Sequence, residues 1–446
     1  MGGHIHVAGV AGVGMSALAQ ALSWTHERVT GSDRFFDQGL SLPIFDALQA
    51  AGVELVKQDG SAVKAGTEAV VYSTAIEEGN PDFIAAKKAG VPLRHRAAVL
   101  AELARGHTVL AVAGTAGKTT TTGMVGWTLE QLGADPTVVN GGALVDWADA
   151  RHVGNVRRGG VDSPWVVEVD ESDRSLLQFF PEWSVLTNIS QDHFTLEEVQ
   201  ALFRTYAGQV HQGLVCGEGV ADVLGEQKAK KFEGMGRPER TEHGFVVEWR
   251  GQQLEVRSPG AHNAWNALMA AELCAQLGYE PIKIAEALRR FGGIQRRLER
   301  VDAGGGVRVV DDYGHNPAKL AAAWTAVSIS KNRVLGAWRP HGFGPLRAMM
   351  DPLADAFALV CRAGDQLWLL PVYDAGGTAD RSVNSDVLVA KLKARGVKVE
   401  WAKDYDELGT QMAREAKRGD TLLVMGARDP QLPVFAREMA SKTAHL

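Results

Sequence analysis

The segment that most constrains the fold is a glycine-rich loop at residues 113–120, with the sequence Ala-Gly-Thr-Ala-Gly-Lys-Thr-Thr. An apolar run ends at this loop and a helical pattern starts from it, so the loop joins a predicted strand to a predicted helix. Backbone N–H groups in such a loop can surround a phosphate chain, while Lys118 can neutralise the β and γ charges and the Thr119 hydroxyl can ligate Mg²⁺. The standard form of the loop has a glycine where this chain has Val112, so the sequence matches a variant of it. The segment therefore predicts an α/β domain that binds nucleotide phosphates.

Strand and helix patterns alternate along most of the chain, which predicts parallel sheets covered by helices. One series begins at residues 4–9, a second at residues 108–113, and a third after a charged stretch that ends near residue 300. The strands of the third series are expected at residues 307–312, 333–338, 366–370, 398–401 and 421–425. A length of 446 residues suffices for about two to four domains. We therefore expect an α/β protein of three domains: a Rossmann-like N-terminal domain (1–105), a central P-loop ATPase-like domain (106–297) and a Rossmann-like C-terminal domain (298–446).

The composition argues against two classes of partner. Only 22% of the residues are charged and the formal net charge is −6, whereas binding to a nucleic-acid backbone requires a basic surface. No window approaches the roughly 18 apolar residues of a membrane span, and the N-terminus lacks the features of a signal peptide. The three cysteines show no metal-ligand spacing, which is typical of a reducing compartment. We expect a cytoplasmic protein, a monomer or homodimer, with small-molecule ligands and neither nucleic acid nor a membrane as its partner.

A second glycine-rich segment lies at residues 9–16, Gly-Val-Ala-Gly-Val-Gly-Met-Ser, again between a strand pattern and a helix pattern. Its glycines would let backbone N–H groups approach a diphosphate at the positive end of the helix. The spacing differs from the dinucleotide-binding fingerprint, which argues against a nicotinamide or flavin cofactor. Asp33 follows about 20 residues later, at the end of the next strand, where a carboxylate can accept hydrogen bonds from ribose hydroxyls. Alternatively, the glycines only allow the strand and helix to pack closely.

Acidic side chains gather at the end of a third apolar strand. Glu168, Asp170, Glu171 and Asp173 follow the run that starts at Trp165, and hard oxygen ligands of this kind suit Mg²⁺. The alternative is a solvated acidic loop. A later segment, Thr-Asn-Ile-Ser-Gln-Asp-His at residues 187–193, places His193 at another strand end. A single histidine is more often structural than a metal ligand, so His193 by itself does not indicate a metal site.

Further short motifs follow in order along the chain. They are Ser-Thr-Ala-Ile at 73–76, Asn-Gly-Gly at 140–142, Gly-Ala-His-Asn-Ala-Trp-Asn at 260–266, Gln-Arg-Arg-Leu at 295–298 and Asp-Asp-Tyr-Gly-His-Asn-Pro at 311–317. Together with the two loops and the acidic strand end, this series resembles the Mur ligase family from residue 9 to about residue 317. The resemblance implies an enzyme whose N-terminal domain holds a UDP-sugar, whose central domain binds ATP, and whose C-terminal domain receives an amino acid. It also implies that the carboxylate of UDP-N-acetylmuramate is activated as an acyl phosphate in the synthesis of peptidoglycan precursors.

The resemblance assigns roles to individual residues. The implied ATP-binding residues are Gly114, Thr115, Gly117, Lys118, Thr119, Thr120, Asn263, Asn266, Arg297 and Asp312. The implied UDP-sugar ligands are Gly12, Gly14, Met15, Ser16, Asp33 and Ser73. The implied Mg²⁺ ligands are Thr119, Glu168 and His193. The implied catalytic residues are Lys118, Glu168, His193 and His315.

The sequence departs from the family pattern at three positions. Ala116 and Asn316 each stand where a histidine is usual, and Gly342 replaces the arginine that follows His341 in the segment that holds the amino acid. His341, Arg339 and Arg347 remain as candidate amino-acid ligands, since a guanidinium is the natural partner of a carboxylate. L-alanine is the expected amino acid, and glycine or L-serine also fits a small pocket. Two alternatives stay open: a ligase that adds a tripeptide to the same UDP-sugar, and a homologue that binds both nucleotides without turnover.

Overall fold

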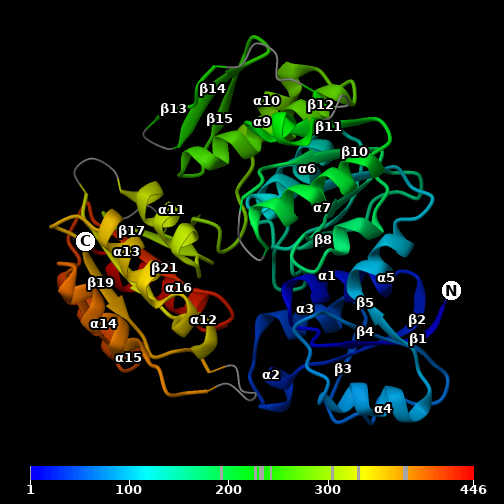
Figure 1. The fold of residues 1–446 in the computed structure, drawn as a ribbon, viewed down its shortest axis with the longest axis horizontal. Coiled ribbons are helices and arrows are strands. Elements are labelled where there is room, and N and C mark those ends of the chain that lie inside the picture. Colours follow the sequence, from blue (N-terminus) through cyan, green and yellow to red (C-terminus); the bar gives the residue numbers. More distant parts are fainter. Residues whose placement is uncertain are drawn as a thin grey trace. The chain divides into compact units, whose positions relative to one another are not determined.

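The computed structural model describes residues 2–190, 194–225, 229–230 (backbone only), 236–241, 244–302, 306–328, 332–374 and 380–446. The chain divides into two compact units, one formed by Met1–Arg257 with His262–Ile294 and the other by Ser258–Ala261 with Gln295–Leu446. Figure 1 shows the elements of each unit.

The first sheet is parallel and five-stranded, with the order β3-β2-β1-β4-β5. Its elements are β1 (Gly2–Ala8), α1 (Val13–Leu22), β2 (His26–Ser32), α2 (Arg34–Asp37), α3 (Pro43–Ala50), β3 (Val53–Val56), β4 (Thr67–Tyr72), α4 (Pro81–Ala89), β5 (Leu93–His95) and α5 (Arg96–Leu103). Strands β2 and β3 lie on one side of β1, and β4 and β5 lie on the other side. The glycine loop after β1 therefore lies at the point where the strand order switches sides, which is where α/β sheets bind ligands.

The second sheet has seven strands in the order β12-β11-β10-β6-β9-β7-β8, and only β8 runs antiparallel to its neighbour. Its elements are β6 (Val109–Ala113), α6 (Lys118–Gln131), β7 (Thr137–Val139), β8 (Val156–Arg157), β9 (Trp165–Glu168), the 3₁₀ helix η1 (Ser175–Gln178), β10 (Trp183–Leu186), α7 (Leu196–Gln209), β11 (Gly213–Cys216), α8 (Val220–Leu224) and β12 (Ala229–Lys230). Strand β6 lies between β9 and β10, so the loop that follows it emerges at the switch point of this sheet.

A small antiparallel sheet completes the first unit, with the order β13-β14-β15. Its elements, and the two helices that follow, are β13 (Glu239–Arg240), β14 (Phe245–Trp249), β15 (Gln252–Val256), α9 (Ala261–Gln276) and α10 (Pro281–Arg289). The buried carboxylate of Glu272 on α9 accepts hydrogen bonds from the Trp249 indole at 3.0 Å and from Arg250 at 2.8 Å. These bonds fix α9, which brings two asparagines to the phosphate loop.

The second unit contains a six-stranded sheet with the order β16-β17-β21-β18-β19-β20, parallel except for β16. Its elements are β16 (Glu299–Arg300), β17 (Arg308–Asp312), α11 (Pro317–Val327), β18 (Val334–Trp338), α12 (Phe343–Ala348), α13 (Met350–Val360), β19 (Gln366–Leu369), α14 (Ser385–Ala394), β20 (Val399–Trp401), α15 (Tyr405–Glu415), β21 (Thr421–Met425) and α16 (Leu432–Thr443). Successive residues Val309 and Val310 belong to different apolar clusters, one beneath α15 and α16 and the other beneath α11, α13 and α14. Helices therefore cover both faces of this sheet (Figure 1).

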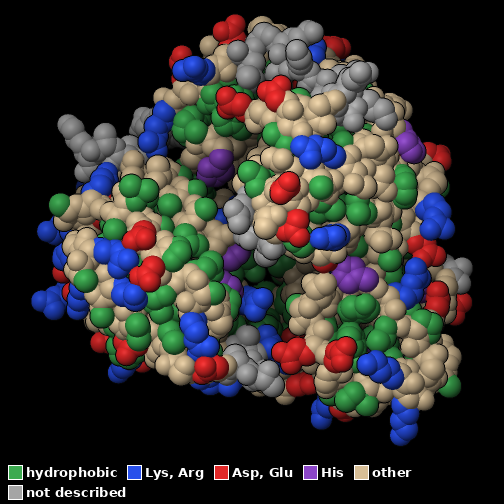
Figure 2. Space-filling view, in the orientation of Figure 1, with side chains coloured by type: hydrophobic (Ala, Val, Ile, Leu, Met, Phe, Trp, Pro, Cys, Tyr) green, Lys and Arg blue, Asp and Glu red, His purple; other side chains and the backbone are tan. Residues whose placement is uncertain are grey.

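The predicted α/β class is confirmed, and the five strands expected in the last third of the chain are present. The three-domain division at residues 105 and 297 stays a prediction. Among the described residues, no helix is both long and apolar enough to cross a lipid bilayer. On the face drawn in Figure 2, the described Lys and Arg side chains are interspersed with Asp and Glu, which agrees with the weakly acidic composition.

Candidate functional site

The phosphate-loop backbone has a conformation that requires glycine at two positions. Gly114 has φ = 129°, and Gly117, the N-cap of helix α6, has φ = 84°. A Cβ at Gly117 would lie 2.5 Å from Oδ1 of Asn266, and one at Gly114 would collide with the hydroxyl of Thr187. The loop is thus folded tightly between β6 and α6, with its N–H groups at the positive end of a 14-residue helix.

The segment after β10 holds the other side of this loop. The N–H of Thr115 donates to the Asn188 carbonyl at 3.1 Å, and the N–H of Ala116 donates to Oδ1 of Asn188 at 3.1 Å. The Thr115 hydroxyl donates to the Ser190 carbonyl at 3.1 Å, and both Thr115 and Thr120 are buried. The next residues, including His193, lie outside the described part of the chain.

Lys118 lies over the loop with its ammonium among carboxylates. Its Nζ donates to the Gly114 carbonyl at 2.8 Å and to Oε2 of Glu171 at 2.6 Å, and lies 3.8 Å from Oδ1 of Asp170. Burial opposes the charge on Lys118, but Glu171, Asp170 and Glu168 outweigh it and raise the pKa of the lysine. Burial also raises the pKa of Glu171 to about 7, although Lys118 opposes that rise. The lysine is therefore charged and held by the carboxylates of Glu171 and Asp170.

Glu168, the last residue of β9, faces the first turn of α6. One of its carboxylate oxygens accepts a hydrogen bond from the Thr119 hydroxyl at 3.1 Å, and the other accepts one from the N–H of Gly141 at 2.8 Å. A Cβ at Gly141 would overlap this carboxylate. No cluster of three or more His, Cys, Asp or Glu side chains able to hold a metal occurs within the described residues. The Thr119 hydroxyl and the Glu168 carboxylate thus lie side by side, with their oxygens 3.1 Å apart.

Two asparagines of α9 reach the same loop. Asn263 and Asn266 are both 4% exposed, and Nδ2 of Asn266 donates to Oδ1 of Asn263 at 3.3 Å. Asn266 lies against the backbone of Gly117. The structure thus brings together residues of β6, α6, β9, the segment after β10 and α9.

The first glycine loop lies at the carboxyl end of β1. Gly9 has φ = 71°, and the N–H of Gly12 donates to its carbonyl at 3.1 Å. Asp33 accepts hydrogen bonds from the N–H groups of Ala11 at 3.1 Å and Phe35 at 2.9 Å. Burial raises the pKa of Asp33, although these two N–H groups oppose the rise. Ser73 follows β4, the neighbour of β1, so it lies at the same edge of the sheet.

Met15 and Ser16 of helix α1, two of the predicted UDP-sugar ligands, are buried, as is Asp33. Met15 is 4% exposed, and the hydroxyl of Ser16 donates to the Val13 carbonyl at 2.9 Å and accepts from Nδ2 of Asn155 at 2.9 Å. The buried Asn155 side chain also donates to the Val13 carbonyl at 2.8 Å. It fixes the first turn of α1, a role that no local sequence pattern indicates.

In the second unit, two histidines lie together beyond the ends of β17 and β18. The His315 and His341 rings make an edge-to-face contact, with centroids 5.0 Å apart. Burial, reinforced by nearby Lys319, lowers the pKa of His315 to about 3. Burial, reinforced by Arg428, lowers that of His341 to about 4. Both imidazoles are therefore neutral, and Nδ1 of His315, 3.1 Å from the Tyr313 carbonyl, donates to it.

Asp312 ends β17 beside this pair. Its carboxylate accepts hydrogen bonds from the N–H groups of Leu298 at 2.9 Å and Gly314 at 2.8 Å. Burial raises the pKa of Asp312 to about 6, although Arg297 opposes the rise. The guanidinium of Arg297 lies 5.1 Å from the centre of the Tyr313 ring.

The two candidate arginines of the amino-acid site both have protein partners. Arg339 forms an ion pair with the buried Asp429 and donates to the Pro371 carbonyl at 3.2 Å. Arg347 forms a more exposed ion pair with Asp380 at 2.8 Å. Each would have to exchange or share a partner to hold a carboxylate ligand.

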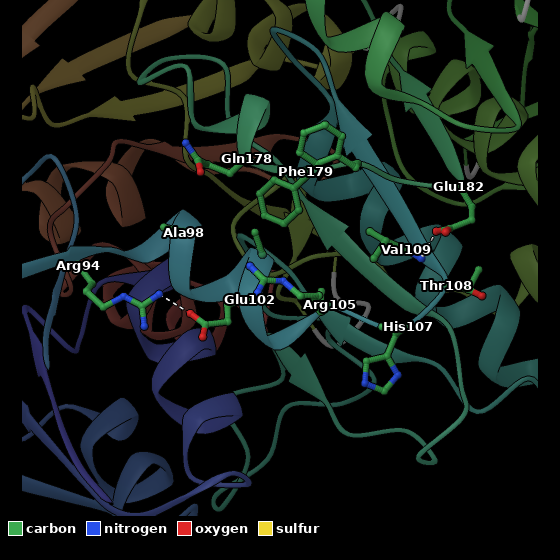
Figure 3. Close-up of a pocket in the computed structure, with 14 residues that line it drawn as sticks. Arg94, Ala98, Glu102, Arg105, His107, Thr108, Val109, Gln178, Phe179 and Glu182 are labelled. Carbon is green, nitrogen blue, oxygen red and sulfur yellow. Dashed lines mark hydrogen bonds and ion pairs between the residues drawn. The ribbon is translucent and has the colours of Figure 1, made fainter. Parts of the chain in front are cut away.

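A cavity of about 690 Å³ lies at the opposite end of β6 from the phosphate loop (Figure 3). The Arg94–Glu102 ion pair lines it, as does Glu182, which accepts a hydrogen bond from the N–H of Val109 at 2.7 Å. Parallel sheets bind their ligands at the carboxyl ends of the strands, and Val109 begins β6. The cavity is therefore separate from the candidate nucleotide site.

The fold and the loop define an α/β protein with a glycine-rich loop of the phosphate-binding type at the switch point of its seven-stranded sheet. Residues 4–108 match the description "Mur ligase family, catalytic domain", and residues 296–428 match "Mur ligase, glutamate ligase domain".

Similar proteins cover almost the whole chain. The UDP-N-acetylmuramate–L-alanine ligase of Rhizobium meliloti is 32% identical over 95% of this chain and 94% of its own length. The enzyme of that name from Gloeobacter violaceus is also 32% identical, over 95% of this chain and 92% of its own. The crystal structure of the UDP-N-acetylmuramate-alanine ligase of Thermotoga maritima superposes with a TM-score of 0.80 at 24% identity, covering 98% of both chains. A murein peptide ligase of Psychrobacter arcticus gives a TM-score of 0.69 at 20% identity, covering 99% of both. The chain belongs to the Mur ligase family, which confirms the resemblance found in the sequence.

Proposed function

We propose that this chain is an ATP-dependent, ADP-forming ligase that joins L-alanine to the carboxylate of UDP-N-acetylmuramate in the synthesis of peptidoglycan precursors. The observation that carries the proposal is the 32% identity, over 95% of the chain, to ligases named for this reaction. The phosphate loop with Lys118, Thr119 and the adjacent Glu168 supplies the site at which such chemistry begins.

The phosphate loop supports the ATP part of the proposal. The N–H groups at the start of α6 would bind the phosphate chain, and Lys118 would exchange its bonds to Gly114 and Glu171 for the β and γ phosphates. Asn263 and Asn266 would face the adenine. The remaining nucleotide ligands that we propose are Gly114, Thr115, Gly117, Thr120, Arg297 and Asp312.

The residues beside the loop fit a magnesium ion. Mg²⁺ usually combines one or two protein carboxylates with phosphate oxygens and water. The Thr119 hydroxyl and the Glu168 carboxylate, 3.1 Å apart, offer two hard oxygen ligands there, and Gly141 orients the carboxylate. We propose that these two residues hold one ion and that His193 holds a second. Bound there, the ions would neutralise charge between the phosphate chain and the substrate carboxylate.

The UDP-sugar is assigned to the first glycine loop. Gly12, Gly14 and the N–H groups of α1 would receive the diphosphate, and Asp33 would accept hydrogen bonds from the ribose. Met15 and Ser16 would act by shaping the first turn of α1, since Met15 is apolar and the Ser16 hydroxyl is already bonded to the Val13 carbonyl and to Asn155. Ser73 would contribute from the end of β4.

The amino acid is assigned to the second unit. We propose that His341 with Arg339 or Arg347 binds its carboxylate and that His315 lies near its amino group. Because His315 donates from Nδ1 to the Tyr313 carbonyl, its Nε2 is left as a proton acceptor. A neutral imidazole is the form that such a role requires.

The chemistry proceeds in two steps. The substrate carboxylate attacks the γ-phosphorus of ATP, the bond to the β-phosphate oxygen breaks, and ADP leaves. Lys118 would hold the charge of the phosphate chain during this step. The neutral amine of L-alanine then attacks the acyl carbon, inorganic phosphate leaves, and the amine loses a proton. No covalent nucleophile of the protein is required.

Phosphate release tests the proposal directly. The purified chain with ATP, Mg²⁺ and UDP-N-acetylmuramate should release phosphate when L-alanine is added, and the panel should include glycine, L-serine and a murein tripeptide. If only the tripeptide stimulates phosphate release, the chain is instead a ligase that adds a tripeptide to the same UDP-sugar. The ligase assignment fails if no amino acid or peptide stimulates release although both nucleotides bind.

Lys118→Ala separates the two nucleotide sites. Loss of the loop lysine should lower turnover by at least about 10³-fold, whereas UDP-N-acetylmuramate should bind as before. Lys283→Ala, which removes an exposed lysine paired with Glu280, is the matched control. Loss of UDP-sugar binding in a folded Lys118→Ala protein would mean that the two sites are wrongly assigned. A cytoplasmic location and a monomeric or homodimeric state stay predictions.

A further inference from the structure

Arg96 lies between the first glycine loop and the acidic end of β9. It is the first residue of α5, which packs beside α1 (Figure 1). Its Nη1 occupies the space beside Gly14, only 2.8 Å from where a Cβ of that residue would be. Its Nη2 donates to Oδ2 of Asp170 at 3.3 Å. One guanidinium thus touches both the proposed UDP-sugar loop and the carboxylates near the phosphate loop.

The guanidinium of Arg96 lies against the positive end of a helix. Gly14 is in the first turn of α1, where unpaired N–H groups create a positive end that repels cations and attracts anions. That turn has no acidic residue, and the N-cap Gly12 provides no side-chain cap. An arginine placed against such a turn is explained if a negatively charged group lies between the guanidinium and the N–H groups.

The present counter-ion of Arg96 is shared. Asp170 also lies 3.8 Å from Nζ of Lys118, and its side chain is 32% exposed. Asp170 therefore connects the cation of one proposed nucleotide site to the cation of the other.

The start of α5 is fixed so that Arg96 keeps this position. Nδ1 of His95 accepts a hydrogen bond from the N–H of Ala97 at 3.4 Å, which leaves the proton on Nε2. That nitrogen lies 3.3 Å from Oδ2 of Asp173, in the same acidic segment as Asp170. The pair anchors the backbone directly before Arg96.

We propose that Arg96 is a substrate-binding residue whose guanidinium holds the diphosphate of the UDP-sugar against the first turn of α1, exchanging Asp170 for the diphosphate as it does so. The inference rests on the proposed function and adds a residue to its UDP-sugar site. It also couples the two sites, because an Asp170 released from Arg96 becomes available to Lys118 and the nucleotide region.

Binding measurements on the full chain, without Mg²⁺ or turnover, test the proposal. Calorimetry with UDP and with UDP-N-acetylmuramate should show at least about a tenfold loss of affinity for Arg96→Ala and a partial recovery for Arg96→Lys. Both ligands should respond alike, since they share the diphosphate. Arg94→Ala is the matched control, because Arg94 pairs with Glu102 and lines the separate cavity. Its affinities should stay within about twofold of the wild type.

Asp170→Asn distinguishes ligand binding from a merely structural ion pair. If Asp170 competes with the diphosphate for Arg96, its neutralisation should tighten the binding of UDP-N-acetylmuramate, whereas Arg96→Ala weakens it. Equal weakening in both variants, or unchanged affinity in a folded Arg96→Ala protein, would overturn the proposal. A wild-type chain that binds no UDP-N-acetylmuramate would instead refute the proposed function itself.

Discussion

The carboxylate of Glu171 lies 2.6 Å from the ammonium of Lys118, the lysine of the phosphate loop. Nucleotide binding, as proposed, draws Lys118 toward the phosphates and leaves this buried carboxylate without its cation. The pKa of Glu171, raised by burial to about 7 even beside Lys118, should then rise further. Glu171 would bind a proton in the complex that it partly lacks in the free protein.

Proton uptake on nucleotide binding follows from this pair. Since the complex holds more protons than the free protein near pH 7–8, affinity for a non-hydrolysable ATP analogue should increase as the pH falls through that range. Calorimetry in buffers of different ionisation enthalpy should show an uptake up to about one proton larger for the wild type than for Glu171→Gln. The same uptake in both proteins would contradict the assignment to Glu171.

The second prediction concerns Gly141, whose N–H holds Glu168. In Gly141→Ala a Cβ would overlap the Glu168 carboxylate and push it away from Thr119. The Mg²⁺ concentration for half-maximal phosphate release should rise by about tenfold or more, because an ion ligand is displaced. Gly79→Ala is the matched control, since its Cβ would meet nothing within 4 Å. A normal Mg²⁺ dependence in a folded Gly141→Ala protein would remove Glu168 from the proposed ion site.

The sequence predicted those parts of the site that are local in the chain. The loop at 113–120, the acidic end of β9 and the loop after β1 each follow an apolar strand directly, so the strand pattern also predicts the sheet edge at which they lie. The order of these motifs in the Mur ligase family then linked them to one another. In the last third of the chain, the alternation of apolar strand patterns with helical patterns predicted the five parallel strands.

The antiparallel sheet β13-β14-β15 was not predicted. Its hairpin turns at Arg250 and Gly251, both with positive φ, 48° and 74°. Two-residue turns of this kind usually have the sequence Asn-Gly or Asp-Gly, so the sequence Arg-Gly did not indicate a hairpin. The alternation of polar and apolar residues in β14 and β15 was the pattern that could have identified the sheet.

Contacts between distant segments were equally invisible in the sequence. Asn155 anchors α1 from 139 positions away from Ser16, and Arg96 reaches Asp170 across 74 positions. Each contact is made by the polar end of one side chain, and the apolar periodicity that predicts strands and helices gives no information about it. Such pairs depend on how the sheets pack, which local periodicity does not specify.

The third prediction is an acid-sensitive stability due to His315 and His341. Their folded pKa values, about 3 and about 4, lie below the unfolded value of about 6.5, so the unfolded chain binds more protons between those limits. Stability should therefore rise with pH across that window and be lost as the pH falls below about 6.5. The loss by pH 5 should be about 1–2 kcal/mol for each histidine.

Denaturant unfolding between pH 8 and pH 5 checks this expectation. His315→Gln and His341→Gln should each flatten the pH dependence, because a neutral side chain removes the difference in proton binding. An unaltered slope in both buried-site variants would mean that these imidazoles are not held neutral.

The last prediction separates the two arginines proposed for the amino-acid carboxylate. Arg339 pairs with Asp429, whose side chain is 2% exposed, so Arg339→Ala leaves a buried carboxylate unpaired and should destabilise the protein by about 2–4 kcal/mol. Arg347→Ala breaks a pair whose arginine side chain is 43% exposed and should leave stability within experimental error.

If Arg347 holds the amino acid, its removal should raise the KM for L-alanine at least about tenfold with little change in melting temperature. If Arg339 does so, Arg339→Lys should keep most of the stability but not the KM, because a lysine keeps the charge without the bidentate geometry. A KM for L-alanine that is unchanged in both Arg347→Ala and Arg339→Lys would exclude both arginines from the amino-acid site.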